Sequence, residues 1–316
     1  MFALLRRLGA LVLTLAVSSF VIFGGMYAAP GDPVTFLIGN PEDRTPERVA
    51  AVRAQYHLDD SLIQQYLLWA KDLLHGDLGS SFVYQQPVAN LLGTRLPVTM
   101  TLVAYAAVLF IVIGVLLGVL SALRRGTAVD SFITGATTFA TSVPNFVVAL
   151  VLVSVFAVEL RWFEVTGSGE GFVDRVYHLT LPAVALALGA LAVVSRVTRQ
   201  TMVEQQSLEH VDVARSFGLS TRRIIWRHVL RNSLGPVITM CGLIIAGMLA
   251  GTVVIESVFG LNGVGSLLVD AINAHDFPVV QAILLYMVIA YMAVTTLIDL
   301  LYPLIDARTL ARSDSA

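Results

Sequence analysis

The chain has 316 residues, of which 56% are hydrophobic and only 13% are charged. Soluble globular domains carry about 25% charged residues, so the composition excludes an ordinary soluble protein. The formal net charge is −2, and the single Cys241 excludes a disulfide framework within the chain.

Six uncharged stretches follow one another along the chain, and each is long enough to cross a bilayer, which takes roughly 20 apolar residues. They lie between Arg7 and Asp32, Arg95 and Arg124, Asp130 and Glu159, Arg175 and Arg196, Arg231 and Glu256, and Asp276 and Asp299. The first stretch is long for the apolar part of a signal peptide and five more follow, so we expect an uncleaved first helix over 1–28. The sequence therefore predicts an all-α polytopic membrane protein with six transmembrane helices.

The basic residues are divided unequally between the two sets of loops that six spans create. Thirteen Lys and Arg residues fall in the set that contains both termini, and seven fall in the other, much longer set. Since Lys and Arg collect on the cytoplasmic side, we predict that both termini are cytoplasmic. The segment 29–97 is then an external subdomain with helices over 46–56 and 61–74. A five-helix core over 98–306 and a cytoplasmic tail over 307–316 complete the predicted domains.

The longest cytoplasmic segment, 196–232, is expected to form two helices joined by a tight turn. A helix with one apolar face is predicted by the helical spacing of Leu208, Val211, Ala214 and Phe217. Gly218 suits the left-handed position that ends a helix, and Ser220 or Thr221 can cap the next helix. The plain alternative is an amphipathic linker whose arginines touch lipid headgroups.

Pro144, Pro182 and Pro236 lie within the predicted spans, where each would kink or locally break a helix. In transporters such breaks often lie near the pathway. Ser142, Pro144 and Asn145 are therefore candidates for the translocation path, with structural kinking alone as the alternative.

Two pairs of glycines in the spans, Gly114 with Gly118 and Gly247 with Gly251, are each spaced by four residues. Small residues at this spacing allow close helix contact. We interpret them as packing positions within the chain and not as a dedicated subunit interface.

Acidic residues mark the outer ends of the last two spans. Glu256 and Asp276 are candidates for contact with an external docking partner or a substrate amine, and Asp77 of the external segment is a third docking candidate. The six histidines are scattered without metal-ligand spacing, so no metal site is expected.

The cytoplasmic loop carries Asp212-Val213-Ala214 with Gly218 six residues after the acid, and it resembles the EAA loop of binding-protein-dependent ABC importer permeases. The family consensus has Glu and Ala where this chain has Asp212 and Val213. The sequence that follows resembles the dipeptide/oligopeptide (and nickel) branch, and the matching residues are Gly218-Leu219-Ser220, Arg227-His228, Leu230-Arg231-Asn232 and Pro236. Matches along the rest of the chain include Ala29-Pro30-Gly31-Asp32-Pro33, Gly76-Asp77-Leu78-Gly79, Arg95-Leu96-Pro97 and Ser142-Val143-Pro144.

This resemblance implies the type I ABC importer permease fold, with a coupling loop at about 200–232. In that family the EAA segment is a coupling helix that docks into a groove of an ATPase subunit at the inner face of the membrane. The residues implied to make the contact are Val211, Asp212, Val213, Ala214, Arg215, Phe217, Gly218 and Leu219. Larger side chains at Ala214 or Gly218 are expected not to fit the groove or the turn.

The resemblance also implies a second homologous permease subunit, two ABC ATPase subunits, an extracytoplasmic solute-binding protein, a peptide substrate and the lipid bilayer as partners, with no nucleic acid. The chain has no G-x-x-x-x-G-K-[ST] stretch. We therefore expect that it is not an enzyme and binds no cofactor, and that ATP and Mg belong to the partner ATPases.

The implied function is inward transport of di- or oligopeptides across the cell inner membrane by alternating access. One alternative is the same architecture importing nickel or glutathione. Another is an ion-coupled secondary carrier, which the scarcity of acids and histidines within the spans disfavours.

Overall fold

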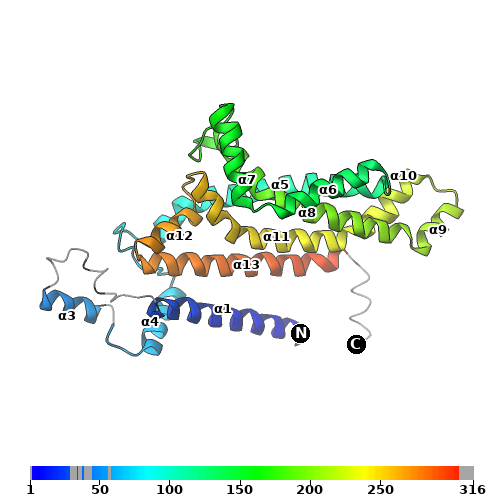
Figure 1. Cartoon of the computed structure of the whole chain (residues 1–316). Coiled ribbons are helices and arrows are strands. Elements are labelled where there is room, and N and C mark those ends of the chain that lie inside the picture. The colour runs from blue at the N-terminus through cyan, green and yellow to red at the C-terminus, as the bar shows by residue number, and fades with distance from the viewer. Residues whose placement is uncertain (1, 29–33, 35–37, 39–44, 56–57, 306–316) are drawn as a thin grey trace. The chain divides into compact units, whose positions relative to one another are not determined.

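The computed structural model describes residues 2–28, 34, 38, 45–55 and 58–305. The predicted tail at 307–316 and the first part of the predicted external segment lie outside these residues. The named helices are α1 (Phe2–Ala28), α3 (Pro46–Gln55), α4 (Leu62–Leu74), α5 (Val88–Leu123), α6 (Ala128–Ser142), α7 (Asn145–Leu152), η2 (Val153–Glu159), α8 (Gly171–Gln206), α9 (Glu209–Ser216), α10 (Thr221–Arg223), η3 (Ile224–Leu230), α11 (Arg231–Val258), α12 (Val264–Asn273) and α13 (Phe277–Ile305) (Figure 1). Of these, η2 and η3 are π-helical. The predicted all-α class is confirmed.

Five helical stretches of the described chain are long and apolar enough to cross a membrane. They are Leu8–Gly25 in α1, α5, α8, the continuous helix Thr221–Val258 and Phe277–Ile298 in α13. The third apolar stretch of the sequence instead forms a bent pair, in which α6 meets α7 and η2 at 99°. With this pair counted as one span, the structure has the six spans that the sequence predicts.

Pro144 explains where the third span breaks. Val143 has an extended backbone (φ −95°, ψ 124°), as residues before proline often do, and Pro144 then occupies the N-cap position of α7. At Pro182 and Pro236, where a kink or a local break is predicted, the helices are not broken, because α8 and α11 continue through them. Packing of neighbouring helices allows a membrane helix to continue through a proline, and Pro182 is buried.

The two helices predicted in the external segment are present as α3 and α4. Helix α4 begins at Ser61, whose hydroxyl accepts a hydrogen bond from the backbone N–H of Gln64. The Gln64 side chain accepts one from the Ser61 N–H at 3.1 Å. This capping box fixes the start of α4 one residue after the predicted position.

The chain divides into two compact units. One contains Met1–Pro97 with Gly263–Ala290, and the other contains Val98–Asn262 with Tyr291–Ala316. These units are defined by packing, and 263–290 packs with the N-terminal residues. The predicted division into membrane and external parts stays a prediction.

In the first unit, α4 packs on α1 through aromatic side chains. The ring of Tyr66 lies 5.2 Å from that of Phe20 and 5.7 Å from that of Phe23, centroid to centroid. The Tyr66 hydroxyl also lies 2.9 Å from Ser19 Oγ. The predicted external helix α4 is therefore attached to the first span and not only linked to it by the chain.

In the second unit, α8 contacts α6, α7 and α11. Helix α5 also approaches α8 closely at its two glycines. A Cβ atom at Gly118 would lie 2.6 Å from the Ser195 carbonyl oxygen, and one at Gly114 would lie 2.9 Å from the α8 backbone. Gly251 of α11 makes ordinary contact with α8, and Gly247 has open space. Packing within the chain is thus confirmed for the first glycine pair.

Candidate functional site

The predicted coupling loop folds as α9, a tight turn and the start of the Thr221–Val258 helix. Gly218 follows α9 with a left-handed φ of 73°. Its N–H donates to the Arg215 carbonyl at 2.9 Å, and the Leu219 N–H donates to the Ala214 carbonyl at 3.3 Å. These two hydrogen bonds form the Schellman motif that ends many helices on glycine. The predicted helix end at Gly218 is confirmed.

The structure corrects two details of this turn. A Cβ at Gly218 would have no atom within 4 Å, so a larger side chain is opposed within this chain by the left-handed backbone and not by lack of space. Ser220 occupies the N-cap position of the next helix with an extended backbone, but its side chain makes no capping hydrogen bond.

The predicted apolar face of α9 is divided between the inside and the outside of the chain. Val211 is fully buried and Ala214 is 6% exposed, whereas Leu208 is 42% and Phe217 is 81% exposed. The buried pair belongs to a small hydrophobic core, here called the loop core, with Ala122, Met202, Ile224 and Val229. The predicted apolar face is therefore not a single surface open to a partner, because half of it packs against the chain itself.

The loop core connects α9 to the rest of the second unit. Ala122 comes from the end of α5, Met202 from the last turns of α8, and Ile224 and Val229 from η3. Because cores of this kind are close-packed, displacement of α9 must displace the ends of these helices too.

The exposed side of α9 borders a groove of about 540 Å³. Its lining residues are Glu209, His210, Val213, Ala214, Phe217, Leu219 and His228. Val213 is 47% exposed, and Asp212 and Arg215 form an exposed ion pair with an N–O distance of 3.1 Å. Of the predicted coupling residues, Val213 and Phe217 thus present an apolar surface, while Val211 anchors the helix.

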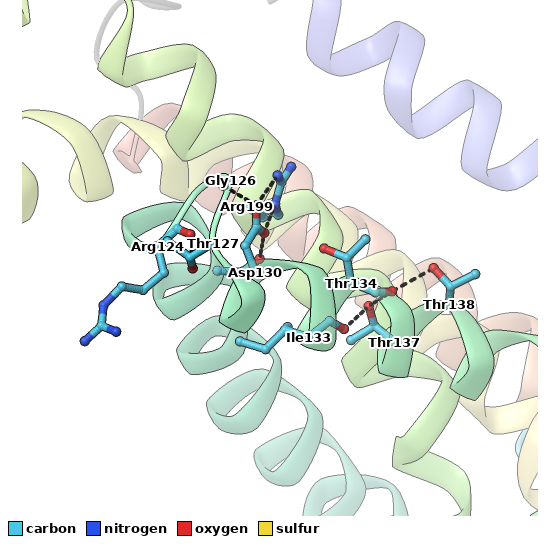
Figure 2. Close-up of polar contacts among 10 residues, drawn as sticks. Arg124, Gly126, Thr127, Asp130, Ile133, Thr134, Thr137, Thr138 and Arg199 are labelled. Atoms are coloured by element: carbon cyan, nitrogen blue, oxygen red, sulfur yellow. Dashed lines mark hydrogen bonds and ion pairs between the residues drawn. The ribbon is translucent and has the colours of Figure 1, made fainter.

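An ion pair between the buried Asp130 and the partly exposed Arg199 holds α8 to the α5–α6 turn, close in sequence to the loop core (Figure 2). Arg199 donates from Nε to Asp130 Oδ1 at 2.7 Å and from Nη2 to Oδ2 at 2.8 Å. Asp130 also accepts from Ser121 Oγ at 2.5 Å and from the Gly126 N–H at 3.0 Å. All the carboxylate hydrogen bonds needed to offset burial of the charge are therefore present in one place.

Sequence reasoning counted Asp130 and Arg199 only as charges that flank spans. Their side chains meet across 69 positions of sequence, and no periodicity relates them. The available signal was an acid at the start of a span, a position where an ionisable residue usually pairs with another group.

The candidate path residues lie at the bend between α6 and α7. Ser142 Oγ donates to the Thr138 carbonyl at 3.0 Å, and Pro144 and Asn145 begin α7. The side-chain oxygen of Asn145 lies against α8, 3.3 Å from where a Cβ at Gly189 would be. Upstream, Thr137 and Thr138 donate to carbonyls of their own helix. The role of Ser142, Pro144 and Asn145 in translocation stays a prediction.

The acids predicted for external docking are placed differently. Asp276 is fully buried, and it accepts hydrogen bonds from the Ser81 hydroxyl, the Phe82 N–H and the Val83 N–H. Glu256 is also buried and accepts from Thr99 Oγ1 at 2.6 Å.

Neither buried carboxylate is presented to a docking partner, so an external docking role for these two residues does not fit the structure. Asp276 instead ties the 81–83 loop to the start of α13. Asp77 is exposed and accepts from the Gly79 N–H at 2.8 Å, so it remains accessible.

Comparison with known families gives two matches that together include most of the chain. The family described as "Binding-protein-dependent transport system inner membrane component" matches residues 114–311. A second description, "Binding-prot-dependent transport system membrane comp, N-term", matches residues 1–103.

Several curated proteins are similar over almost their full length. The probable peptide ABC transporter permease protein y4tP of Sinorhizobium fredii is 35% identical over 308 residues, with 96% of this chain and 98% of that protein covered. The dipeptide transport system permease protein DppB of Lactococcus lactis subsp. cremoris is 35% identical, with coverage of 96% and 98%. The oligopeptide transport system permease protein AppB of Bacillus subtilis is 35% identical, with coverage of 94% and 95%.

Solved structures share the fold at low identity. A chain of the inward-facing MetNI methionine ABC transporter aligns with a TM-score of 0.57 and 15% identity, covering 68% of this chain and 96% of its own. An amino acid ABC transporter crystallised with histidines aligns with a TM-score of 0.51 and 17% identity, covering 68% and 94%.

Proposed function

Because the chain belongs to the binding-protein-dependent transport system inner membrane component family, we propose that it forms one half of the membrane pathway of an importer for di- or oligopeptides. Members of this family are multi-pass inner-membrane permease subunits of ABC importers and are not themselves catalytic. The partners in this proposal are a second homologous permease subunit, two ABC ATPase subunits that bind ATP and Mg, and an extracytoplasmic solute-binding protein. The proposed cargo follows the relatives, whose names specify peptides, dipeptides and oligopeptides.

The observation that carries the proposal is the two-sided construction of α9. An apolar groove bordered by Val213 and Phe217 faces outward, and exposed apolar surface of this kind favours a protein partner. The other side of the same helix is fixed in the loop core by Val211. A partner that grips the groove therefore moves the ends of α5 and α8, together with the helix that begins at Thr221.

Such a connection is what alternating access requires. The transport bundle needs two discrete arrangements, and a nearly complete switch between them takes about 5.5 kcal/mol of differential binding. In the proposed complex the ATPases supply this energy. They bind at the cytoplasmic side of the membrane, where α9 and both termini of the chain also lie. The basic residues that gather in the same set of loops support this orientation.

The test compares two phenylalanines of nearly equal exposure. Phe217 in the groove is 81% exposed, and Phe172 at the start of α8 is 80% exposed. The intact complex is purified with Phe217→Ala or Phe172→Ala and reconstituted, and peptide uptake and ATP hydrolysis are measured.

We expect Phe217→Ala to lower uptake at least about tenfold, since an aromatic anchor in an interface contributes roughly 2 kcal/mol or more. Phe172→Ala should leave uptake unchanged. Normal uptake with normal ATPase retention in Phe217→Ala would refute the coupling role of this groove. Competition of uptake by a mixture of dipeptides tests the cargo separately.

A further inference from the structure

A second surface lies beside the turn, on the helix that follows it. Arg222, Arg223, Trp226 and Arg227 are exposed and, with Ser220, line a hollow of about 420 Å³. None of these residues lines the α9 groove, so the two surfaces are distinct. We call the second one the basic–aromatic surface.

The charge on this surface is not paired with a carboxylate of the described residues. Arg199 and Arg215 each pair with a carboxylate, but no carboxylate in the described part of the chain lies within 4.0 Å of Arg222, Arg223 or Arg227. Three guanidinium groups within six positions repel one another unless an anion is near. Within the described residues, the structure therefore presents a cluster of cations without a paired carboxylate.

The depth of the cluster along its helix identifies the source of the anion. The uncharged part of this span begins after Arg231. An α-helix rises roughly 1.5 Å per residue and the π-helical η3 rises less, so Arg227 lies at most about 6 Å and Arg222 at most about 14 Å outside that boundary. The polar headgroup layer extends about 5–8 Å beyond the hydrocarbon on each side. Arg227 is therefore at headgroup depth, whereas Arg222 lies farther out and reaches the headgroup layer only through its long side chain.

Trp226 lies between these arginines and is 59% exposed. Tryptophan is enriched at the boundary between membrane and water, because its ring is apolar and its N–H is polar. On the buried side of the same helix, Ile224 and Val229 belong to the loop core. The exposed tryptophan is thus not needed for packing of the chain, and its surroundings match a bilayer interface.

We propose that Arg222, Arg223, Trp226 and Arg227 bind the headgroups of anionic phospholipids. The arginines donate hydrogen bonds to lipid phosphates, and Trp226 rests on the adjoining glycerol and upper acyl region. The helix that begins at Thr221 carries this surface on α10 and η3 and part of the loop core on η3. Bound anionic lipid therefore holds the first turns of that helix, against which α9 packs. The proposal rests on membrane insertion of this helix and not on peptide as the cargo or on the ATPase contact of α9.

The test uses Trp226 as the reporter in the full chain. Trp69→Phe and Trp162→Phe remove the other two tryptophans, and the protein is reconstituted into bilayers. One bilayer contains brominated phosphatidylglycerol in plain phosphatidylcholine, and the other contains brominated phosphatidylcholine at the same fraction in plain phosphatidylglycerol. We expect quenching in the first bilayer to indicate about fivefold enrichment of the anionic lipid, which is roughly 1 kcal/mol.

Replacement of the three arginines by Gln should bring the enrichment down to about one. Arg124→Gln with Arg125→Gln, an exposed pair at another turn, should leave it unchanged. Absence of quenching, or equal quenching in the two bilayers, would overturn the proposal. If equal quenching is accompanied by loss of ATPase co-purification in the triple variant, the surface belongs to an acidic protein partner instead.

Discussion

Val211 and Val213 lie two residues apart on α9, yet Val211 is fully buried whereas 47% of Val213 is exposed. The first is held by residues of α5, α8 and η3, and the second borders an open groove. One short helix therefore has an anchored side that determines folding and a free side that is available to a partner. Substitutions on the two sides should separate stability from transport.

The largest effect is expected from the same substitution made on each side. Val211→Asp places a carboxylate in the loop core without a partner and should lower the free energy of unfolding by more than about 4 kcal/mol. Val213→Asp leaves the carboxylate in water and should change stability by less than about 0.5 kcal/mol while lowering peptide uptake. Thermal unfolding of the purified chain measures the change in stability, and uptake by the reconstituted complex measures the change in transport. Equal destabilisation would show that α9 has no anchored side.

The ion pair in Figure 2 should give the next largest effect. Arg199→Met leaves the buried Asp130 with its hydroxyl and N–H donors but without its cation. Because Arg199 is partly exposed, the substitution should lower the free energy of unfolding by about 2 kcal/mol, less than for a fully buried pair. Arg196→Met, on an exposed position of the same helix, is the matched control. Comparison of the two melting temperatures tests the prediction. A melting temperature of Arg199→Met equal to that of the control would show that the pair does not hold α8 to the α5–α6 turn.

Gly218 ends α9, and its replacement should have an intermediate effect on stability and transport. Val at a φ of 73° is strained by about 1–2 kcal/mol, although space for the side chain is open. Gly218→Val is expected to leave the protein inserted in the membrane while uptake per ATP hydrolysed falls. Gly218→Asn tolerates the same backbone and should retain most uptake. Normal coupling in Gly218→Val would show that the turn does not transmit movement.

The smallest effect concerns the N-caps of two helices, the one that follows the Gly218 turn and α4. Ser220 makes no side-chain capping bond, so Ser220→Ala should alter the free energy of unfolding by less than about 0.5 kcal/mol. Ser61 of α4 has a complete capping box, and Ser61→Ala should cost about 1 kcal/mol. Chemical denaturation of both variants provides the comparison, and a reversed order would contradict the hydrogen bonds described for them.

Much of the fold follows from sequence because a bilayer imposes simple length and polarity requirements on each span. The six stretches, the helices at 46–55 and 62–74, and the end of α9 at Gly218 could all be found from composition, caps and turn residues. The bend at Pro144 was predicted because proline disrupts a helix. The continuity of α8 through Pro182 was not, since it depends on neighbouring helices that a single sequence does not reveal.

The candidate site shows a similar division. The resemblance of 211–219 to an EAA loop located the segment, but periodicity alone gave it a single apolar face. Periodicity reports that a side chain is apolar and says nothing of whether its own chain or a partner covers it. Likewise, Glu256 and Asp276 stand at span ends in the sequence, and only the structure shows that Thr99 and the 81–83 loop occupy their carboxylates.

By itself, the sequence determined that this protein is a helical membrane permease with six spans. Apolar runs and turns depend on residues that are close together in sequence, so they can be recognised without the tertiary structure. Tertiary structure decided which residues of α9 are anchored, that Asp130 pairs with Arg199, and which arginines remain without a partner in the described chain. These features depend on contacts between segments tens of residues apart. The energy of such contacts comes from burial and distance in space, which sequence order does not record.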